Sequence, residues 1–367
     1  MTLARYLLWF ICVLAWFSFL CALKYPFRKK RMIPIRIIMI VVKALLTVFT
    51  AYEVMVDESP IVYRLSFVLA SLYVALFGDT LGDIIALPIM LLKKKGNNLI
   101  FQVVASAVCV ITYLIAGTVN MQTVSANRFD VKSDKITEDY KVVFVSDLHV
   151  GSSQSLKTTK RTIDKIASEK PDLVLLGGDI TDEMTTKEEM EEVYRLIGKL
   201  EAPVYFIYGN HDRQPDHFGT VEEKYSEDEL INAITSNGIT ILKDEWINFS
   251  DELVIFGRED CSSEDRKALS DIDPRPEGCF VLQIDHSPYE KDDITNSGSD
   301  LQLSGHSHAG QIFPLKALYT VAGYDAYGFF HYGDTELYVS SGASGWSFPF
   351  RTENKCYYEV ITLEPES

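Results

Sequence analysis

The sequence has few cysteines and few basic residues outside its first third, and both shortages narrow the possible functions. The six cysteines show no paired spacing of the kind that binds structural zinc. Cys261, Cys279 and Cys356, the three beyond the first third, are expected to be small buried side chains without a disulfide. After residue 122 the chain has 23 lysines and arginines against 46 aspartates and glutamates. That acidity repels polyanions, so nucleic acid is not an expected partner.

The first third of the chain contains long apolar runs. Because about 20 apolar residues cross the hydrocarbon of a bilayer, four segments qualify as membrane spans: Tyr6–Leu23, Ile33–Tyr52, Leu65–Leu92 and Leu99–Asn120. The third is longer than one span needs, so we expect it to tilt, to break near Gly78–Gly82 or to project beyond the lipid. A cleavable signal peptide is the alternative for the first segment, but no small-x-small site follows it.

Basic residues between the spans predict the orientation. Nine of them lie in the first and third loops: Lys24, Arg28, Lys29, Lys30, Arg31, Arg36, Lys93, Lys94 and Lys95. The second loop carries Glu53, Asp57 and Glu58 instead. Since basic loops stay in the cytoplasm, both termini and the acidic remainder are expected on the outer face of the cell membrane. Arg5 near the N-terminus opposes this orientation, but it is one charge against nine.

Two aspartates, Asp79 and Asp83, lie inside the third apolar segment, four residues apart and so on one helix face. Acids at membrane depth are costly, which makes them candidate functional residues of the membrane region. The alternative is a polar contact that holds the helices together, or a kink near the interface. No basic partner for them is obvious in the other predicted spans.

The remainder of the chain alternates short apolar runs with helical stretches. Apolar runs at 142–145, 173–176 and 204–208 are separated by predicted helices at 157–169 and 185–200, an order typical of a parallel sheet. A short helix follows over Ser226–Asn237. Further strands are expected at Ile239–Leu242, Leu253–Gly257, Phe280–Ile284, Leu301–Leu303, Tyr338–Ser340 and Tyr357–Leu363.

These elements predict three parts of the chain. Residues 1–122 form an α-helical membrane region with four spans. Residues 123–139 form a polar connector, and residues 140–367 form an α/β domain.

Histidines gather at the ends of the predicted strands. Five of the seven histidines follow a strand and stand beside aspartate, asparagine, glycine or serine: His149, His211, His286, His306 and His308. His217 and His331 do not. Ligand groups of a parallel sheet lie outside the carboxyl ends of its strands, and imidazole, carboxylate and amide ligands favour Zn, Mn or Fe.

The strand ends carry five motifs in order: Asp147-x-His149, Gly178-Asp179-x-x-Asp182, Gly209-Asn210-His211-Asp212, His286 and Gly305-His306-x-His308. Together they resemble the motif set of the calcineurin-like metallophosphoesterases, over about residues 140–310. The resemblance implies a four-layer α/β/β/α sandwich around two divalent metal ions. It implies that the ligands of one metal are Asp147, His149 and His308, and those of the other Asn210, His286 and His306. Asp179 would bridge the two.

The resemblance also implies catalytic roles. Two cations that share a carboxylate lower the pKa of a water and stabilise charge on a phosphoryl group. His211 lies beside a ligand without being one, and it would protonate the leaving oxygen or stabilise the pentacoordinate state, with Asp182 orienting its ring.

Beyond residue 310 the chain resembles an exported or membrane-anchored branch of that family. The likeness rests on Gly310-Gln311, Tyr327-Gly328, Tyr338–Gly342 and Pro349–Arg351, and it ends at Lys355–Val360, where this chain departs from the branch. Gln311 and Arg351 are candidate substrate contacts. For Arg351 a surface or sheet-edge ion pair is the alternative.

The expected function is a membrane-anchored hydrolase of phosphoesters or pyrophosphates that acts outside the cell, close to the bilayer. The apolar segment Gln311–His331 favours a phosphorylated lipid or lipid-linked carrier as substrate if part of it is exposed, and a core hairpin is the alternative. Two other functions stay open: a phosphatase of soluble extracytoplasmic or cell-wall phosphoesters, and a non-catalytic sensor or binding protein with the same fold. The sequence predicts no oligomeric state.

Overall fold

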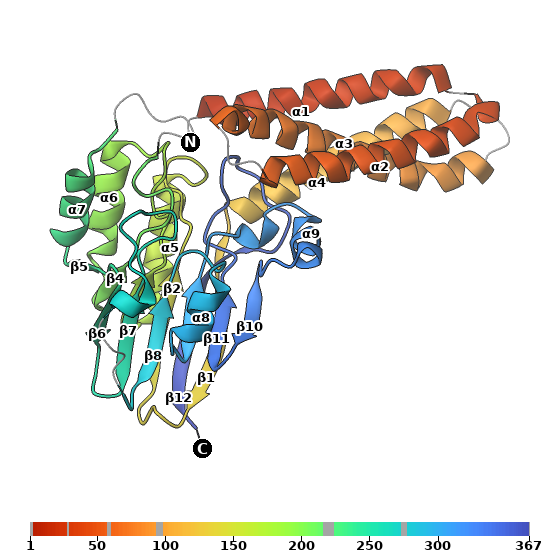
Figure 1. Ribbon diagram of the computed structural model, residues 1–367. Coiled ribbons are helices and arrows are strands. Elements are labelled where there is room, and N and C mark those ends of the chain that lie inside the picture. The colour runs from red at the N-terminus through yellow and green to blue at the C-terminus, as the bar shows by residue number, and fades with distance from the viewer. Residues whose placement is uncertain are drawn as a thin grey trace. The chain divides into compact units, whose positions relative to one another are not determined.

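The computed structural model describes residues 3–27, 29–56, 60–92, 98–215, 224–272 and 277–366. These residues form two compact units, a helical unit over Thr2–Val119 and an α/β unit over Asn120–Ser367 (Figure 1). Several residues used in the sequence analysis lie outside the described residues: Arg28, Asp57, Glu58, Lys93, Lys94, Lys95 and His217.

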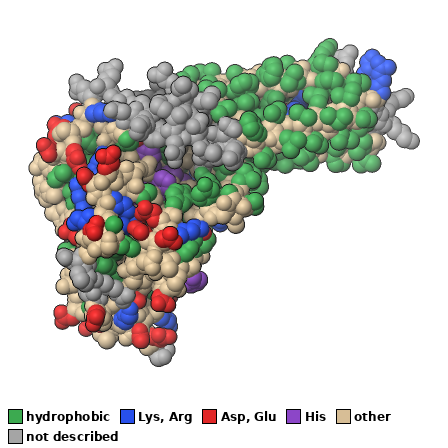
Figure 2. Space-filling model, in the orientation of Figure 1, with side chains coloured by type: hydrophobic (Ala, Val, Ile, Leu, Met, Phe, Trp, Pro, Cys, Tyr) green, Lys and Arg blue, Asp and Glu red, His purple; other side chains and the backbone are tan. Residues whose placement is uncertain are grey.

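The helical unit consists of four long helices: α1 (Leu3–Lys24), α2 (Ile33–Val56), α3 (Pro60–Leu92) and α4 (Asn98–Met121). Each contains a stretch long and apolar enough to cross a membrane. Large apolar side chains point outward along all four helices, and Figure 2 shows hydrophobic atoms covering this unit. These helices have the length and surface of a multi-span membrane anchor, which confirms the four predicted spans.

Helix α3 is continuous through Gly78 and Gly82, so of the three alternatives for this long segment the break is excluded. A Cβ atom on Gly78 would lie 2.6 Å from the Val110 side chain, and one on Gly82 would lie 2.3 Å from the Ser106 Cα atom. The two glycines therefore let α3 and α4 approach closely, as small residues four apart do in membrane helices.

The α/β unit contains two six-stranded sheets. The first has the order β1 (Val124–Ser133), β12 (Cys356–Pro365), β2 (Tyr140–Val145), β3 (Leu173–Leu176), β4 (Val204–Phe206) and β5 (Ile239–Ile241). The second has the order β10 (Gly328–Tyr332), β11 (Thr335–Val339), β9 (Leu301–Ser304), β8 (Phe280–Ile284), β7 (Leu253–Gly257) and β6 (Glu245–Asn248). The helices are α5 (Leu156–Glu169), α6 (Lys187–Ile197), α7 (Glu227–Thr235), α8 (Lys291–Asn296) and α9 (Leu315–Ala322).

The packing of β2 shows how these elements form layers. Val142 and Phe144 point into the core between the two sheets, while Val143 and Val145 point to the other face, where α5, α6 and α7 pack. Strand side chains alternate between faces, so a strand buried on both sides is a continuous apolar run. On the outer face of the second sheet, Ile294 of α8 packs against β11. The predicted four-layer α/β/β/α sandwich is confirmed.

The strands that the sequence analysis missed are β1, β6 and β10, and each lies at the edge of a sheet. The predicted polar connector is therefore wrong for residues 124–133, because β1 pairs in parallel with β12 along its whole length. Edge strands face solvent on one side and carry polar side chains, which hides their apolar pattern. One predicted strand, Tyr338–Ser340, is displaced, since β11 spans Thr335–Val339.

Candidate metal centre

The predicted metal ligands follow five strands. In the first sheet β2, β3 and β4 are parallel neighbours, and in the second sheet β8 and β9 are parallel neighbours. The loops after them carry Asp147 and His149, Asp179, Asn210, His286, and His306 and His308, in that order. Because parallel strands end at the same edge of a sheet, both sheets present their loops to one place.

The backbone at these loop positions is unusual. Asp147, His149, Asp179, His306 and His308 all have φ between +44° and +67°, a region that residues other than glycine rarely adopt. Such strain is concentrated at functional sites, where surrounding contacts hold it in place. Gly178, with φ of +85°, and Gly209 lie against each other, and a Cβ on Gly178 would be 2.5 Å from the Gly209 nitrogen. The glycines of the motifs thus allow the β3 and β4 loops to approach.

The side chains form two clusters. Ligand atoms of Asp147, His149 and His308 lie within 4.8 Å of one another, and so do those of Asp179, His286 and His306. Asp179 Oδ2 is 3.0 Å from His286 Nε2 and 3.7 Å from His149 Nε2, so this carboxylate lies between the clusters.

Asn210 joins the second cluster, since its Oδ1 is 2.8 Å from His306 Nδ1. The structure therefore brings together all seven residues predicted as ligands.

Three of the histidines are oriented by contacts at Nδ1. His286 Nδ1 is 2.8 Å from the Gly177 carbonyl oxygen, His308 Nδ1 is 3.1 Å from the Ser344 carbonyl oxygen, and His149 Nδ1 is 3.1 Å from Asp182 Oδ2. These contacts leave each Nε2 for another partner. Nε2 of His149 and of His286 is buried and makes no hydrogen bond of good geometry among the described residues, although His286 Nε2 lies 3.0 Å from Asp179 Oδ2. Buried nitrogens without partners, beside carboxylates, fit a pair of divalent cations.

The protonation states of His306, His308 and Asp179 favour metal binding. Burial by itself would lower the pKa values of His149 and His286, but Asp182 and Asp179 raise them, so a cation would displace a proton from these two rings. Burial lowers the pKa of His308 to about 3, and burial together with nearby His286 lowers the pKa of His306 to about 4. Burial by itself would raise the pKa of Asp179, but His286 and His211 hold it well below its usual range. Neutral imidazoles and an ionised carboxylate are the forms that bind metals.

His211 lies beside the clusters and is paired with Glu183, not with Asp182. His211 Nδ1 is 2.6 Å from Glu183 Oε1, whereas Asp182 contacts His149. The prediction that Asp182 orients His211 is therefore wrong, because the two adjacent carboxylates point to different histidines. Burial by itself would lower the pKa of His211, but Glu183 and Asp179 raise it to about 10. Burial also raises the pKa of Glu183, yet at this distance the imidazolium favours the ionised carboxylate.

Asp212 holds two of the ligand loops together, a role that the sequence analysis did not assign. Its carboxylate accepts hydrogen bonds from the backbone nitrogens of Asp179, Ile180, Thr181 and Gly209, at 2.8 to 3.1 Å. The backbone nitrogen of His211 in turn donates to Asp179 Oδ1 at 2.8 Å. The β3 and β4 loops are thus fastened around the bridging carboxylate.

Arg351 and Gln311 are structural rather than free to meet a substrate. Arg351 is fully buried and donates to four backbone carbonyl oxygens, those of His308, Ser341, Ser344 and Glu353, at 2.6 to 3.1 Å. Gln311 is also buried, and its amide is bonded to the backbone of the 346–350 loop. Neither side chain is exposed in this structure, so a substrate contact by either one stays a prediction that these backbone contacts do not support. Arg351 supports the loop of a metal ligand instead.

Trp346 is a site residue that the sequence analysis missed. Its ring centroid lies 5.5 Å from that of His211, with an angle of 30° between the planes. Gln311 positions it by accepting a hydrogen bond from the Trp346 backbone nitrogen at 2.9 Å. No local pattern around Trp346 indicated this contact, which depends on a loop 135 residues from His211 in the chain.

Asp79 and Asp83 lie in the helical unit and do have basic partners. Lys24 at the end of α1 and Lys43 in α2 each pair with both aspartates. The expectation that no basic partner exists is wrong, because Lys43 lies inside the second span. The observed contacts agree with the alternative reading, a polar contact between helices.

The two sheets meet at a cluster of imidazoles and carboxylates. A fold and a ligand set of this kind are typical of hydrolases that use two metal ions. Residues 140–310 match the family model of the calcineurin-like phosphoesterases. The chain therefore carries a calcineurin-like metallophosphoesterase domain, as its five motifs indicated.

Named relatives support the same family. An uncharacterized metallophosphoesterase from Helicobacter pylori is 28% identical over 229 residues, which cover 59% of this chain and 58% of that protein. The uncharacterized metallophosphoesterase YkuE from Bacillus subtilis is 28% identical and covers 62% of this chain and 80% of its own length. Phosphodiesterase YaeI from Escherichia coli is 29% identical over 61% of this chain and 82% of its own length. This chain thus spans little more than half of the Helicobacter relative.

Proposed function

We propose that this protein is a membrane-anchored, metal-dependent hydrolase of phosphoric esters or anhydrides. The observation that carries the proposal is the pair of ligand clusters on either side of Asp179, with the protonated His211 next to them. Asp147, His149 and His308 would hold one divalent cation, and Asn210, His286 and His306 the other. Bound cations supply Lewis acidity, which activates water and neutralises charge on a phosphoryl group. Manganese, zinc and iron all suit these ligands.

The residues of the chain then have separate tasks. His211, held by Glu183, donates a proton to the leaving oxygen. Asp182 keeps the His149 ring in the orientation that a ligand needs. A protein that only bound metals would have no use for an acid positioned beside the clusters, so the His211–Glu183 pair favours an enzyme over a metal-binding sensor.

Two substitutions test this proposal. Asp179→Asn is expected to lose bound metal and phosphoesterase activity together. His211→Ala is expected to keep its metal while the turnover falls by about 10²–10⁴-fold, the usual contribution of acid–base catalysis. His331→Ala, a change at an exposed histidine of β10 that is not a ligand, serves as the control. Metal analysis and turnover on a chromogenic phosphodiester and monoester are the measurements. Full turnover in His211→Ala would refute its role.

We also propose a phosphorylated lipid or lipid-linked carrier as the substrate. Among the described residues of the α/β unit, the large apolar side chains that are exposed all lie between 289 and 329: Tyr289, Phe313, Val321, Tyr324 and Phe329. Val321 on α9 is 88% exposed. Exposed apolar groups of this kind suit contact with acyl or prenyl chains.

These side chains are connected to the metal ligands by a row of aromatic rings. The Tyr289 ring centroid is 5.3 Å from that of His306 and 5.8 Å from that of Tyr324. Helix α4 ends at Met121 and β1 begins at Val124, so very little chain separates the last span from the α/β unit. Such a short connection favours a substrate that stays in the membrane interface.

Paired assays on lipid and soluble substrates test the lipid proposal. Phe313→Ser combined with Val321→Ser should raise the KM for phosphorylated lipids in vesicles by about tenfold, given the transfer energies of these side chains. It should leave the KM for a soluble chromogenic phosphate unchanged. Ala322→Ser is the matched control on the same helix. Phe329 is a poorer choice, since it packs against Phe129 and Tyr338. Equal losses on both substrates would contradict a lipid-binding surface and favour a soluble phosphoester.

The proposed location of the α/β unit is outside the cytoplasmic membrane, and it rests on the nine basic residues of the first and third loops. The test is impermeant thiol labelling of Ser367→Cys in intact cells. Cys261 is exposed, so the variant is made in a Cys261→Ser background. Labelling of intact cells is expected. Labelling only after lysis would reverse the orientation.

A further inference from the structure

Among the side chains that the structure describes, the helical unit buries more positive than negative charge. Lys24 Nζ lies 3.0 Å from Asp83 Oδ1, and Lys43 Nζ lies 2.9 Å from Asp83 Oδ2, while both lysines also pair with Asp79. Two lysines and two aspartates balance in charge. Arg36, only 5% exposed, is an additional buried cation, which leaves a net charge of +1.

Arg36 has weak partners for a buried guanidinium. Its Nε donates to the Phe27 carbonyl oxygen, and its Nη1 donates to the Met90 sulfur at 3.0 Å. A thioether sulfur is a poor acceptor. Its Nη2 is buried without a hydrogen-bond partner, and no carboxylate of the described residues forms an ion pair with Arg36. Burying a cation without a counter-ion in a membrane region is costly, so a ligand that supplies negative charge would stabilise it.

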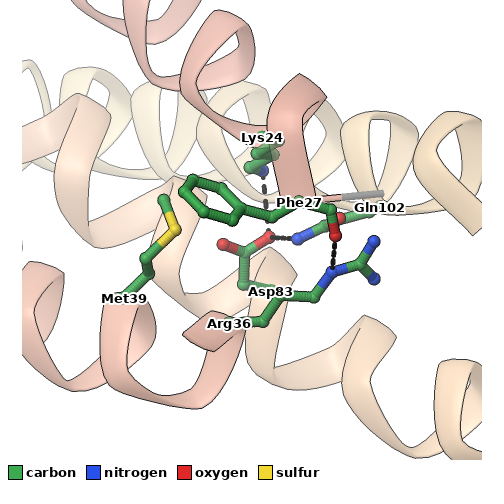
Figure 3. A pocket seen from close by; sticks show the side chains of 6 residues that line it. All are labelled: Lys24, Phe27, Arg36, Met39, Asp83 and Gln102. Carbon is green, nitrogen blue, oxygen red and sulfur yellow. Dashed lines mark hydrogen bonds and ion pairs between the residues drawn. The ribbon is translucent and has the colours of Figure 1, made fainter. Parts of the chain in front are cut away.

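A small pocket lies beside this guanidinium (Figure 3). It is lined by Lys24, Phe27, Arg36, Met39, Asp83 and Gln102. Its enclosed space is about that of one water molecule. The space can accept one oxygen of an oxyanion but not a whole headgroup. Asp83 would repel an anion, but Lys24 and Lys43 offset its charge.

The position of the pocket indicates the kind of ligand. Lys24 is the last residue of α1, and Arg36 lies in the first turn of α2, about 4.5 Å inside its start at 1.5 Å per residue. Between them Lys29 and Arg31 are exposed. Headgroup phosphates lie at the ends of membrane-spanning helices, so a cation buried near the end of α1 and the start of α2 suits an anionic headgroup.

We propose that this pocket binds a phosphate oxyanion, supplied by the headgroup of an anionic phospholipid, with one oxygen against Arg36 Nη2. The site is distinct from the metal centre and does not depend on the proposed hydrolase activity.

The experiment measures lipid retention by the full-length protein. Purified protein is incubated with phosphatidylglycerol or with phosphatidylcholine, and bound lipid is counted by native mass spectrometry. Arg36→Gln is expected to retain phosphatidylglycerol about tenfold less than wild type, since it loses a charge-assisted hydrogen bond. Lys29→Gln removes an exposed charge from the segment between α1 and α2. This variant should retain phosphatidylglycerol as wild type does. Met39→Phe fills the pocket without changing its charge and should also lose the lipid.

The outcomes separate the possible ligands. Retention of phosphatidylglycerol by both Arg36→Gln and Met39→Phe, or an equal loss in Lys29→Gln, would overturn the proposal. If Arg36→Gln does not fold, retention of phosphatidylglycerol by Met39→Phe is enough to refute the proposed site. A second arm adds inorganic phosphate without lipid. A rise in Tm that wild type shows and Met39→Phe lacks would support the oxyanion site with free phosphate as its ligand, and no response to either phosphate source would refute it.

Discussion

The contact between Glu183 and His211 predicts how the rate depends on pH. The two atoms are 2.6 Å apart and both side chains are buried, so the carboxylate stabilises the imidazolium form. Replacing it by a neutral amide in Glu183→Gln removes a charge-assisted hydrogen bond worth about 1.5–3 kcal/mol. At 1.36 kcal/mol for each pKa unit, the pKa of His211 should fall by about 1 to 2 units.

The direction of the change follows from the role of His211 as an acid. The wild-type pKa is raised, to about 10, so the protonated form persists well above neutral pH. Lowering the pKa of His211 moves the alkaline limb of the pH–rate profile to lower pH. Cations held by the neighbouring ligands would lower this pKa in both proteins, so the difference between the two proteins is the quantity to measure. The rate on the acid side of the profile should stay close to that of wild type.

The assay is the pH dependence of kcat on a soluble phosphodiester, for wild type, Glu183→Gln and Asp182→Asn. Asp182 contacts His149, so Asp182→Asn should reduce metal occupancy without moving the alkaline limb. An unmoved limb in Glu183→Gln would refute the assigned partner of His211. If the alkaline limb moves only in Asp182→Asn, Asp182 would be the partner of His211, as the sequence predicted.

Three further predictions concern residues outside this pair. Burial, with Asp147 nearby, raises the pKa of Glu359 to about 8, so the folded state binds this proton more tightly than the unfolded state and stability falls between about pH 5 and pH 8. In metal-free protein, Glu359→Gln should remove this loss of stability with rising pH. Parallel curves of Tm against pH for wild type and Glu359→Gln would contradict the prediction. Gly82→Leu should lower the Tm of the helical unit because a side chain there meets Ser106, whereas Leu81→Phe at an exposed position should not; equal Tm values in both variants would refute the close contact. Arg351→Lys cannot reach all four carbonyl oxygens and should weaken metal binding about tenfold in calorimetric titration, so an unchanged affinity would argue against its support of the His308 loop.

Much of the fold follows from local patterns in the sequence. The central strands β2 (from Val142) and β3 are buried on both faces, so each appears as a continuous apolar run that ends at its motif. The buried strands β8 and β9 are mostly apolar but contain Gln283 and Gln302. The four spans are recognisable because hydropathy is a property of one segment at a time. Edge strands such as β1 lack this signal, since only one of its ten residues is fully buried.

The sequence by itself determined which residues gather at the metal centre, because parallel strands place the residues that follow them at one edge of the sheet. Only the tertiary structure decided how those residues and their neighbours pair. Asp182 and Glu183 are adjacent in the chain, yet one contacts His149 and the other His211. Lys43 pairs with Asp79 across 36 positions, and Arg351 contacts the His308 loop across 43. Such pairs depend on side-chain direction and on packing between distant segments, which spacing along the chain does not encode.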